Sequence, residues 1–414
     1  MTALKIDSCR ICGSTELTSF LDLGEHPMAD AFVEPAKLDD LEFTAPLVVC
    51  ACADCGLIQL RHVVPPAILY DESYVYESSI THMGQRHWTE FSLTSSDIAD
   101  LSPGDLVVDI GSNVGVLLEK FRDCGATILG VDPAPTIAHI ANGRGIETLE
   151  AVFDQKISEQ VLASSGPAKI ITATNVFAHI HDLHSLIQAV RTLMAEDGLF
   201  IVEAPYVPNM LRALEYDTIY HEHLSYLSLR PIMRLVEQYD LEVFDVQQHD
   251  IHGGSFRIFI RRAAGSGKIS SVVDDLVRLE EAAGVYRLER LNRFAADVSE
   301  HRTKLLGMLN ILKQGGRRIA GVSAPAKGMT LLNYCGIGPE TLSYITEKSE
   351  LKVGRYSPGS KIPIKPDSSL LEDAPDYALI LAWNFAEEIM QNLKSYSQNG
   401  GKFIIPIPEP HIIG

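Results

Sequence analysis

The sequence lacks any run of about 18 apolar residues, the length that a helix needs to cross a bilayer. Its opening stretch, MTALKIDSCR, also has no apolar core of the kind found in signal peptides. Positive charge is scarce, because 35 Lys and Arg face 54 Asp and Glu, which gives a formal net charge of −19. We therefore expect a cytoplasmic protein that has neither nucleic acid nor a membrane as a partner.

Cysteine is too scarce for a disulfide framework, since a chain of 414 residues contains seven of them, an odd number. Four form two pairs of equal spacing, Cys9 and Cys12 in CRICG and Cys52 and Cys55 in CADCG. This spacing lets both thiolates of a pair reach one ion, and two pairs predict a structural zinc site without an open coordination position. Cys50 is a spare that could replace Cys52, and four separate thiols are the alternative.

The dinucleotide-binding fingerprint GxGxxG has three glycines. The turn between the first predicted strand and helix of the central region has one glycine fewer. LVVDIGSNVG, residues 106–115, predicts a buried strand and a tight turn, and VLLEKFRDCG then has helical spacing. Asp132 ends the next predicted strand, where a carboxylate suits a ribose diol. DxGxxxG followed by an acid resembles the first two motifs of class I S-adenosylmethionine-dependent methyltransferases, and GSNVG in place of GxGxxG disfavours a nicotinamide-dependent oxidoreductase.

The residues expected to hold this cofactor lie at the turn and at the ends of the following strands. Small residues in the turn let a ligand approach the backbone, and the helix start offers unpaired amides to a carboxylate. In a doubly wound sheet, ligands bind at the carboxyl ends of the strands. The candidate cofactor-binding residues are Gly111, Asn113, Gly115, Asp132, Phe153, Asp154 and Asn175.

Imidazole, phenol and carboxylate groups are concentrated just after the fifth predicted strand, in YHEHLSY. Tyr220, Glu222 and His223 belong to this run, and such groups are costly to bury without a purpose. A metal is an alternative, but His221 and His223 would lie on opposite faces of a helix, which differs from the geometry of HExxH.

Further aromatic and imidazole side chains are expected near the same cleft. His179 follows the fourth predicted strand, and His252 lies in the turn of a predicted antiparallel hairpin. Tyr74 and Tyr76 are two residues apart, so both would project to one side of an extended chain and could face a ligand. Packing between two domains is the alternative for this tyrosine pair.

The order of predicted elements indicates an α/β protein of several domains. We expect a small zinc-binding module in residues 1–70 and a central class I, Rossmann-like methyltransferase sheet in residues 71–262. Residues 263–310 have a long helical period and predict a helical connector. Residues 311–414 contain the run RRIAGVSAPAKGMTLLNYCGI, which repeats the pattern of strand, turn and helix. We therefore expect a second Rossmann-like α/β domain.

Eight motifs in order resemble the S-adenosylmethionine-dependent sugar C-methyltransferases of deoxysugar biosynthesis. They are CRICG with CADCGLIQL, YDESYVYESS, VVDIGSNVG, ATNVFAHI, EAPY, YDTIYHEHLSY, HGGSFR and SAPAKGMTLLNYCGI. The resemblance implies methylation of a carbon beside the ketone of a nucleotide-linked 4-keto-deoxysugar, with carbon 3 of a dTDP sugar as the expected position. It also implies S-adenosylmethionine and structural zinc as cofactors.

Methylation of carbon requires a base that removes a proton next to a carbonyl. An imidazole with a pKa of about 6.5 suits neutral pH, and we expect His223 to be this base, with Glu222 or a phenol setting its tautomer. The side chains that are candidates for polarising the ketone or holding the sugar are Tyr74, Tyr76, Asn175, His179, Tyr220 and His252.

The nucleotide diphosphate is expected to bind the second sheet. Lys327 lies at a predicted helix start in APAKG, a position that suits phosphate oxygens, and Asn333 and Arg355 would add to that surface. Charged residues that cap loops are the alternative. Sugar O-methylation, nicotinamide-dependent oxidation and a non-catalytic binding protein remain alternative functions. The sequence is compatible with a monomer and leaves the oligomeric state open.

Overall fold

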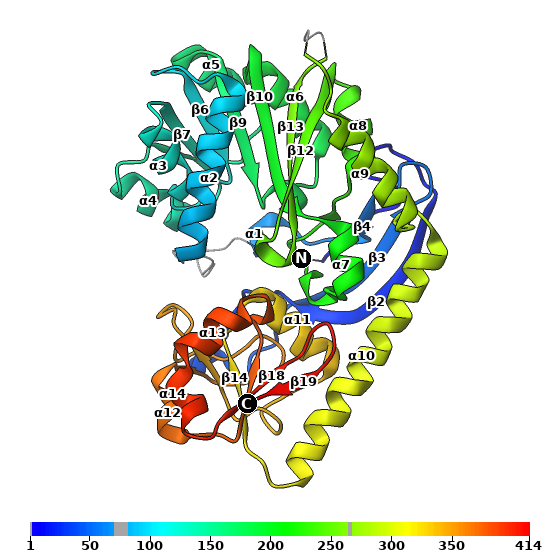
Figure 1. Cartoon of the computed structure of the whole chain (residues 1–414), viewed down its shortest axis with the longest axis vertical. Coiled ribbons are helices and arrows are strands. Elements are labelled where there is room, and N and C mark those ends of the chain that lie inside the picture. The colour runs from blue at the N-terminus through cyan, green and yellow to red at the C-terminus, as the bar shows by residue number, and fades with distance from the viewer. Residues whose placement is uncertain (1, 70–81, 264–266) are drawn as a thin grey trace.

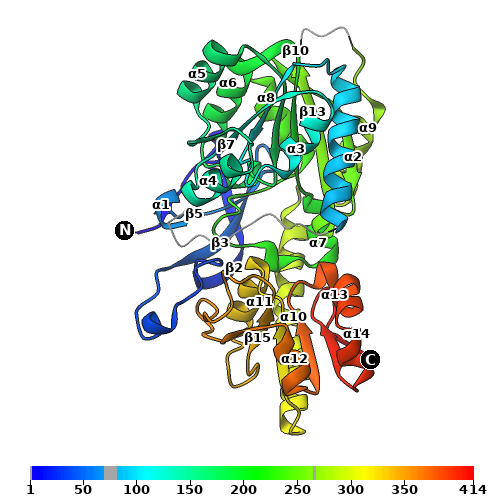
Figure 2. The same cartoon turned by 90° about the vertical axis from the view of Figure 1, so that its left-hand side faces the viewer.

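The computed structural model describes residues 2–69, 82–263 and 267–414, so Tyr74 and Tyr76 lie outside the described residues. A seven-stranded sheet lies at one end of the long axis and a six-stranded sheet at the other, with a four-stranded sheet between them (Figure 1). The turned view in Figure 2 shows the same order of the three sheets. The small third sheet therefore joins the two α/β parts of the molecule.

The four-stranded sheet has the antiparallel order β11-β4-β3-β2 and belongs to the N-terminal module. Its edge strand β11 (Ser225–Tyr226) comes from the central part of the chain and pairs with β4, so it fixes the backbone two residues after His223. The elements of the module are β1 (Leu4–Lys5), β2 (Leu17–Pro27), η1 (Pro35–Lys37), β3 (Thr44–Cys52), β4 (Ile58–Leu60), β5 (His62–Val63) and α1 (Pro66–Leu69).

The central sheet has the order β12-β13-β10-β9-β6-β7-β8, in which β10, β9, β6, β7 and β8 are parallel. All five residues of β6, LVVDI, are buried, as expected for a central parallel strand. Its first elements are α2 (His82–Ala99), β6 (Leu106–Ile110), α3 (Val116–Asp123), β7 (Thr127–Asp132), α4 (Pro135–Gly143), β8 (Thr148–Glu150), α5 (Gln155–Ser165), β9 (Ala168–Thr174) and η2 (Phe177–His179).

The last two strands of this sheet form the predicted antiparallel hairpin. Strand β13 runs against β10 and β12 runs against β13, so β12 has the direction of the parallel strands and its turn lies at their carboxyl edge. The remaining elements are α6 (Leu183–Leu193), β10 (Met194–Pro205), α7 (Val207–Ala213), η3 (Tyr216–Thr218), β11, α8 (Leu229–Glu237), β12 (Leu241–His249), η4 (Ile251–Gly253) and β13 (Ser255–Arg262).

Two helices, α9 (Ser271–Ala282) and α10 (Leu288–Gln314), connect the central sheet to the C-terminal part. Helix α10 is 27 residues long and buries apolar side chains at helical spacing, among them Leu291, Phe294 and Val298. Figure 1 shows it along one side of the molecule, from the central part to the C-terminal sheet. Its apolar face joins a core that contains residues of both the N-terminal module and the C-terminal sheet.

The C-terminal sheet has the order β16-β15-β14-β17-β18-β19 and is parallel except for β19. This confirms the expected second Rossmann-like α/β domain. Its elements are β14 (Ile319–Val322), α11 (Ala326–Cys335), β15 (Ile345–Glu347), β16 (Ile364–Pro366), α12 (Ser368–Asp373), β17 (Tyr377–Ile380), η5 (Trp383–Phe385), α13 (Ala386–Asn392), α14 (Lys394–Gln398), β18 (Lys402–Ile405) and β19 (His411–Ile413). In the described ranges, no helix combines the length and apolar character needed to span a membrane.

A buried ion-pair network attaches helix α2 to the central sheet. Arg257, whose side chain is fully buried, contacts Glu203 at 2.9 Å and Glu90 at 3.1 Å, and His87 Nε2 lies 2.6 Å from Glu203 Oε1. Burial of Glu203 opposes ionisation, but the hydrogen bond with His87 and the charge of Arg257 outweigh it and lower the pKa of Glu203. The central sheet therefore depends on Arg257 to keep a buried carboxylate paired.

Replacing Arg257 by Met leaves the Glu203 charge buried without its main counter-charge. We expect Arg257→Met to lower the free energy of unfolding by about 3–5 kcal/mol. Arg278 pairs with Asp275 on the surface of α9, so Arg278→Met is expected to change the same quantity by less than about 0.5 kcal/mol. Urea denaturation followed by circular dichroism measures both values, and equal losses in the two variants would contradict the assignment.

Candidate active site

The four predicted zinc ligands converge at one point. Cys9 Sγ lies 3.4 Å from Cys55 Sγ, Cys12 Sγ lies 3.5 Å from Cys52 Sγ, and the four sulfurs are within 4.8 Å of one another. Zinc–sulfur bonds of about 2.3 Å in a tetrahedron place sulfurs about 3.8 Å apart, so the set fits this ion. The Ile11 amide also points at Cys9 Sγ, at 3.5 Å. The donors are thus arranged as in a zinc knuckle.

Cys50 is not part of this cluster. Its thiol is fully buried and donates to the carbonyl oxygen of Gln59, 3.5 Å away, and burial raises its pKa. The choice of Cys52 as the ligand is confirmed, because Cys52 and not Cys50 lies with the other three sulfurs.

The turn after β6 has the backbone conformation that the GSNVG pattern predicts. Gly111, Asn113 and Gly115 have φ angles of 68°, 49° and 81°. The Asp132 carboxylate accepts hydrogen bonds from the amides of Asn113 and Ala134, both at 2.9 Å. Burial raises the pKa of Asp132, and these two amides oppose the rise. The carboxylate is therefore fixed against the turn at the carboxyl end of β7.

The two glycines of this turn are required by protein packing. A Cβ atom at Gly111 would lie 2.5 Å from Val176, and one at Gly115 would lie 2.4 Å from Ile146. Both positions also have positive φ, which side chains other than glycine adopt at a cost. The sequence suggested that the small residues of the turn let a ligand approach the backbone. In the structure, the side chains of Val176 and Ile146 make this close approach to the two glycines.

The other cofactor candidates lie at the ends of the neighbouring strands. Phe153 is buried just after β8, and Asp154 accepts a hydrogen bond from the Ile157 amide and caps α5. Asn175, directly after β9, has a φ of 56°. Its main-chain N–H donates to the main-chain carbonyl oxygen of Glu203 at 2.7 Å. Asp154 therefore has a structural role at a helix start, and Asn175 is held at the carboxyl edge of the sheet.

The run YHEHLSY lies after η3 within what we call the 215–226 segment. Its first residues are irregular and its last two form β11. His223 is half-buried, and its Nδ1–H donates to the Thr218 carbonyl oxygen at 2.7 Å. Its Nε2 accepts a hydrogen bond from the Tyr220 hydroxyl at 2.8 Å. Because a carbonyl oxygen can only accept, the proton of the neutral imidazole is on Nδ1 and the lone pair is on Nε2.

His179 is packed beside this imidazole, with the two ring centroids 4.9 Å apart. Burial lowers the pKa of His179 to about 4, so the ring is neutral at pH 7. A neutral ring keeps one N–H donor and places no positive charge next to His223. The structure thus brings the side chains of His179, Tyr220 and His223 together.

The other members of the run are directed differently. His221 is buried, and its Nε2–H donates to the Ala45 carbonyl oxygen of the N-terminal module at 3.0 Å. Glu222 is also buried, with 5% of its surface exposed. Among the described residues, the clusters with metal-compatible spacing do not include His221 or His223.

A second cluster with ligand-like spacing, formed by His87, Glu90 and His249, belongs to the ion-pair network of α2. Arg257 is bonded to Glu90 and to Glu203 there, and a guanidinium among these carboxylates disfavours a cation. Glu203 lies near the carboxyl end of β10, and both of its oxygens are bonded inside the protein, one to His87 and the other to Arg257.

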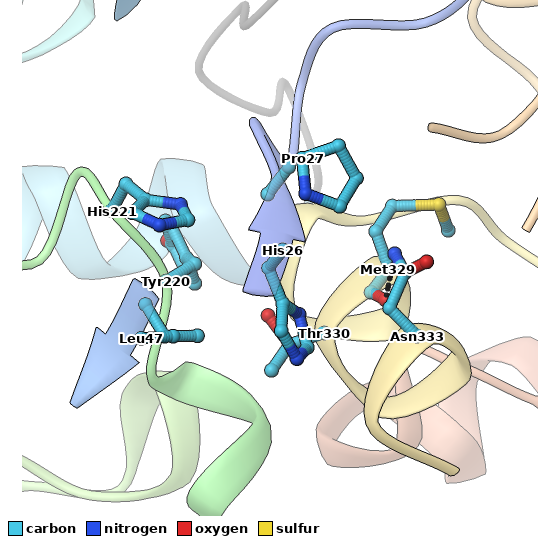
Figure 3. A pocket seen from close by; sticks show the side chains of 9 residues that line it. His26, Pro27, Leu47, Tyr220, His221, Met329, Thr330 and Asn333 are labelled. Carbon is cyan, nitrogen blue, oxygen red and sulfur yellow. Dashed lines mark hydrogen bonds between the residues drawn. The ribbon is translucent and has the colours of Figure 1, made fainter. Parts of the chain in front are cut away.

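A small cavity, too narrow to hold a water molecule, lies where the three parts of the chain meet (Figure 3). Tyr220 and His221 lie on one side of it and the side chains of helix α11 on the other, with the end of β2 between them. The residues that line it are His26, Pro27, Ala29, Leu47, Tyr220, His221, Met329, Thr330 and Asn333. The cavity brings Tyr220 and Asn333, which are 113 positions apart in the sequence, to one place.

The remaining substrate candidates lie on or near the second sheet. Lys327 Nζ donates to Asn384 Oδ1 at 3.2 Å and lies 4.8 Å from the ring centre of Trp383. Asn333 Nδ2 donates to the carbonyl oxygens of Met329 and Pro358, the first of which is drawn in Figure 3.

Arg355 is half-buried in the loop before β16, and His252 lies in η4, at the hairpin turn between β12 and β13.

Comparison with known proteins decides the reaction class. Over 408 residues, 99% of this chain and 97% of the relative, the sequence is 37% identical to C-methyltransferase NovU of Streptomyces niveus. The chain belongs to the C-methyltransferase family. Residues 9–70 match the model "Putative zinc binding domain", residues 86–246 match "Methyltransferase domain", and residues 250–408 match "C-methyltransferase C-terminal domain".

Weaker similarities cover less than half of this chain. A ubiquinone biosynthesis O-methyltransferase of Cupriavidus pinatubonensis is 28% identical over 27% of this chain and 51% of its own. The structure of magnesium protoporphyrin IX methyltransferase (ChlM) from Synechocystis PCC 6803 with bound SAH covers 45% of this chain and 90% of its own, at 14% identity and a TM-score of 0.35, which is too low to bear on fold or function.

This C-methyltransferase uses S-adenosylmethionine and holds a structural zinc at its four clustered cysteines. The expectation of a methyltransferase is confirmed, and the nicotinamide-dependent alternative and the non-catalytic alternative are excluded by the family match. A methyltransferase also implies a small-molecule acceptor.

The zinc assignment can be tested with two cysteines that lie two residues apart. We expect Cys52→Ser to reduce bound zinc from one ion per chain to a small fraction, because one of the four thiolates is lost. Cys50→Ser is the matched control and should keep its zinc, since Cys50 lies outside the cluster. Metal content by plasma mass spectrometry measures both, and zinc loss in the Cys50 variant alone would reverse the assignment.

Proposed function

We propose that the protein transfers a methyl group from S-adenosylmethionine to a carbon next to the ketone of a nucleotide-linked 4-keto-deoxysugar. The proposed position is carbon 3 of a dTDP sugar, reached through an enolate. The observation that carries this proposal is the protonation of His223, whose Nδ1–H is bonded to the Thr218 carbonyl oxygen and whose Nε2 keeps a lone pair. A base in this form is what abstraction of a proton from carbon requires.

His223 would take the proton of the substrate carbon on Nε2. The positive charge that develops on the ring is stabilised by the Nδ1–H bond to the Thr218 carbonyl oxygen. The electron pair of the broken C–H bond then lies on the enolate. S-adenosylmethionine, when bound, supplies an electrophilic methyl group carried by a sulfonium.

Two neighbouring groups would stabilise the enolate oxygen. The hydroxyl of Tyr220 is 2.8 Å from His223 Nε2 and would turn its hydrogen from this nitrogen to the substrate oxygen, so that Nε2 can take the proton while the enolate gains a hydrogen bond. The neutral ring of His179 is packed beside the base. Glu222, Tyr74 and Tyr76 remain proposed contributors on the strength of the sequence pattern.

The cofactor would lie at the carboxyl edge of the central sheet, against the turn between β6 and α3. Asp132 is the proposed ligand of the ribose diol, and Asn113, Phe153, Asp154 and Asn175 are proposed to complete the site with the two glycines of the turn. Both Asp132 oxygens accept one amide each, and each still has a lone pair for a hydroxyl.

The nucleotide diphosphate would bind the second sheet through Lys327, Asn333 and Arg355, with His252 near the sugar. Support comes from the cavity at the junction, since Tyr220 and Asn333 line it together. A nucleotide sugar could therefore have its sugar beside the base and its diphosphate on the C-terminal part. Carbon as the methyl acceptor is favoured over a sugar hydroxyl because the relative matched along the whole chain is a C-methyltransferase.

The role of His223 can be tested by substitution. We expect His223→Asn to lower kcat by about 10²–10⁴-fold, because Asn cannot accept the proton, and to leave the Kd for S-adenosylmethionine within twofold. Exchange of the substrate proton in D2O without S-adenosylmethionine should be lost as well. His139→Asn, on the exposed face of α4, is the control and should behave like the unaltered protein.

The substrate class can be tested by mass spectrometry of reactions with dTDP-linked 4-keto-6-deoxyhexoses, the corresponding 4-hydroxy sugars and the free keto sugars. We expect a gain of one methyl group only for the nucleotide-linked ketones, together with deuterium exchange at the carbon beside the ketone. Methylation of the 4-hydroxy sugars without exchange would instead establish O-methylation.

A further inference from the structure

The 3-10 turn η3, which precedes the Tyr220 and His223 loop, is bonded to the C-terminal part of the chain. The Tyr216 hydroxyl lies 3.1 Å from Nδ1 of His301 on α10. His301 Nε2 lies 2.6 Å from the Pro406 carbonyl oxygen, so Nε2–H is the donor to that carbonyl and Nδ1 accepts the hydrogen of Tyr216. Tyr216 is completely buried, so this chain of bonds is shielded from water.

The next residue of the turn, Asp217, is bonded to a different element of the C-terminal sheet. Its side chain has no exposed surface, and its Oδ2 accepts a hydrogen bond of 2.6 Å from the indole N–H of Trp383 in η5. Burial raises the pKa of Asp217, while the charge of Lys327 and the Trp383 hydrogen bond oppose the rise. A short bond from a neutral donor to a buried carboxylate restricts both partners to one geometry.

A third contact follows two residues later. The hydroxyl of Thr330 on α11 donates to the main-chain oxygen of Ile219 at 3.2 Å. The residues at positions 216, 217 and 219 are thus bonded to three different elements, namely α10, η5 and α11. The residue between them, Thr218, presents the carbonyl oxygen that accepts the Nδ1–H of His223.

We propose that Asp217 and Trp383 are positioning residues for the base: through their hydrogen bond the C-terminal domain sets the position of the Thr218 carbonyl oxygen, and with it the tautomer and direction of His223. This inference rests on the proposed role of His223. It assigns to the second sheet a function in catalysis that is separate from binding the nucleotide. Neither Asp217 nor Trp383 touches the reacting atoms in this proposal, since both act through the backbone of η3.

The expected consequence is a loss of turnover without a loss of binding. Trp383→Phe keeps an aromatic ring near Lys327 and removes the indole N–H donor together with one ring of the indole. We expect kcat to fall at least tenfold for a dTDP-linked 4-keto-6-deoxyhexose, while KM for that sugar and the Kd for S-adenosylmethionine change less than threefold. Deuterium exchange at the carbon beside the ketone, measured without S-adenosylmethionine, should slow by the same factor as kcat.

The pH profile separates positioning from a general structural effect. A looser Thr218 carbonyl stabilises the protonated ring of His223 less, so the acidic limb of kcat/KM, where the base must lose its proton, is expected to move to lower pH. Asp217→Asn keeps an oxygen acceptor for Trp383 and should retain more turnover than Asp217→Ala. This graded rescue is not expected if the pair only contributes to folding.

A matched control is available in the same domain. Tyr396→Phe also removes a donor from a buried aromatic side chain, which is bonded to the Pro375 carbonyl oxygen at 3.0 Å and, among the described residues, makes no hydrogen bond with η3. Its kcat and pH profile should equal those of the unaltered protein, whatever the change in melting temperature.

The outcomes distinguish this proposal from the proposed function. If Trp383→Phe leaves kcat and the acidic limb unchanged while His223→Asn abolishes turnover, the positioning role is wrong and His223 remains the base. If Trp383→Phe and Tyr396→Phe lose activity equally, with no movement of the limb, the role is only structural and the proposal is again overturned. If His223→Asn retains turnover, the proposed mechanism itself fails.

Discussion

One hydrogen bond, from Nδ1–H of His223 to the Thr218 carbonyl oxygen, determines what the candidate site can do. It puts the proton on the nitrogen that faces the protein and leaves Nε2 as the acceptor beside Tyr220. Both bonded partners lie in the 215–226 segment, of which only η3 and the two-residue strand β11 are regular. A segment with so little regular secondary structure depends on its neighbours for its position, and the N-terminal module and the C-terminal sheet both bond to it.

The N-terminal module contacts the 215–226 segment through a residue of the zinc site. Arg10 lies between the ligands Cys9 and Cys12, is buried, and donates from one nitrogen to the carbonyl oxygens of Leu60 and Leu224, both at 3.0 Å. Leu224 is the residue after the proposed base. A closed four-thiolate zinc cannot bind substrate, but it orders the knuckle that carries Arg10. The metal site therefore contributes to the shape of the active site by mechanical support and not by chemistry.

Sequence patterns predicted the parts of this structure that depend on neighbours in the chain. The CxxCG pairs gave the zinc ligands, and the LVVDIGSNVG pattern gave β6, its turn and the acid Asp132, because spacing alone determines these. The bond between Asp217 and Trp383 joins residues 166 positions apart and has no local pattern. Glu203 shows the same limit: it lies near the end of β10, and its partner Arg257 comes from the neighbouring strand β13, 54 positions later in the sequence, where no local pattern indicates the pair.

The topology explains why the reaction would take place at the 215–226 segment. This segment leaves the central sheet after the carboxyl end of β10, beside the turn proposed to bind the cofactor. Lys327 and Trp383 follow the carboxyl ends of β14 and β17 in the second sheet, and Trp383 contacts the same segment. Ligands of parallel α/β sheets bind at such edges. With two edges directed at one irregular segment, the proposed substrate, extending from one sheet toward the other, would lie close to the segment that carries His223.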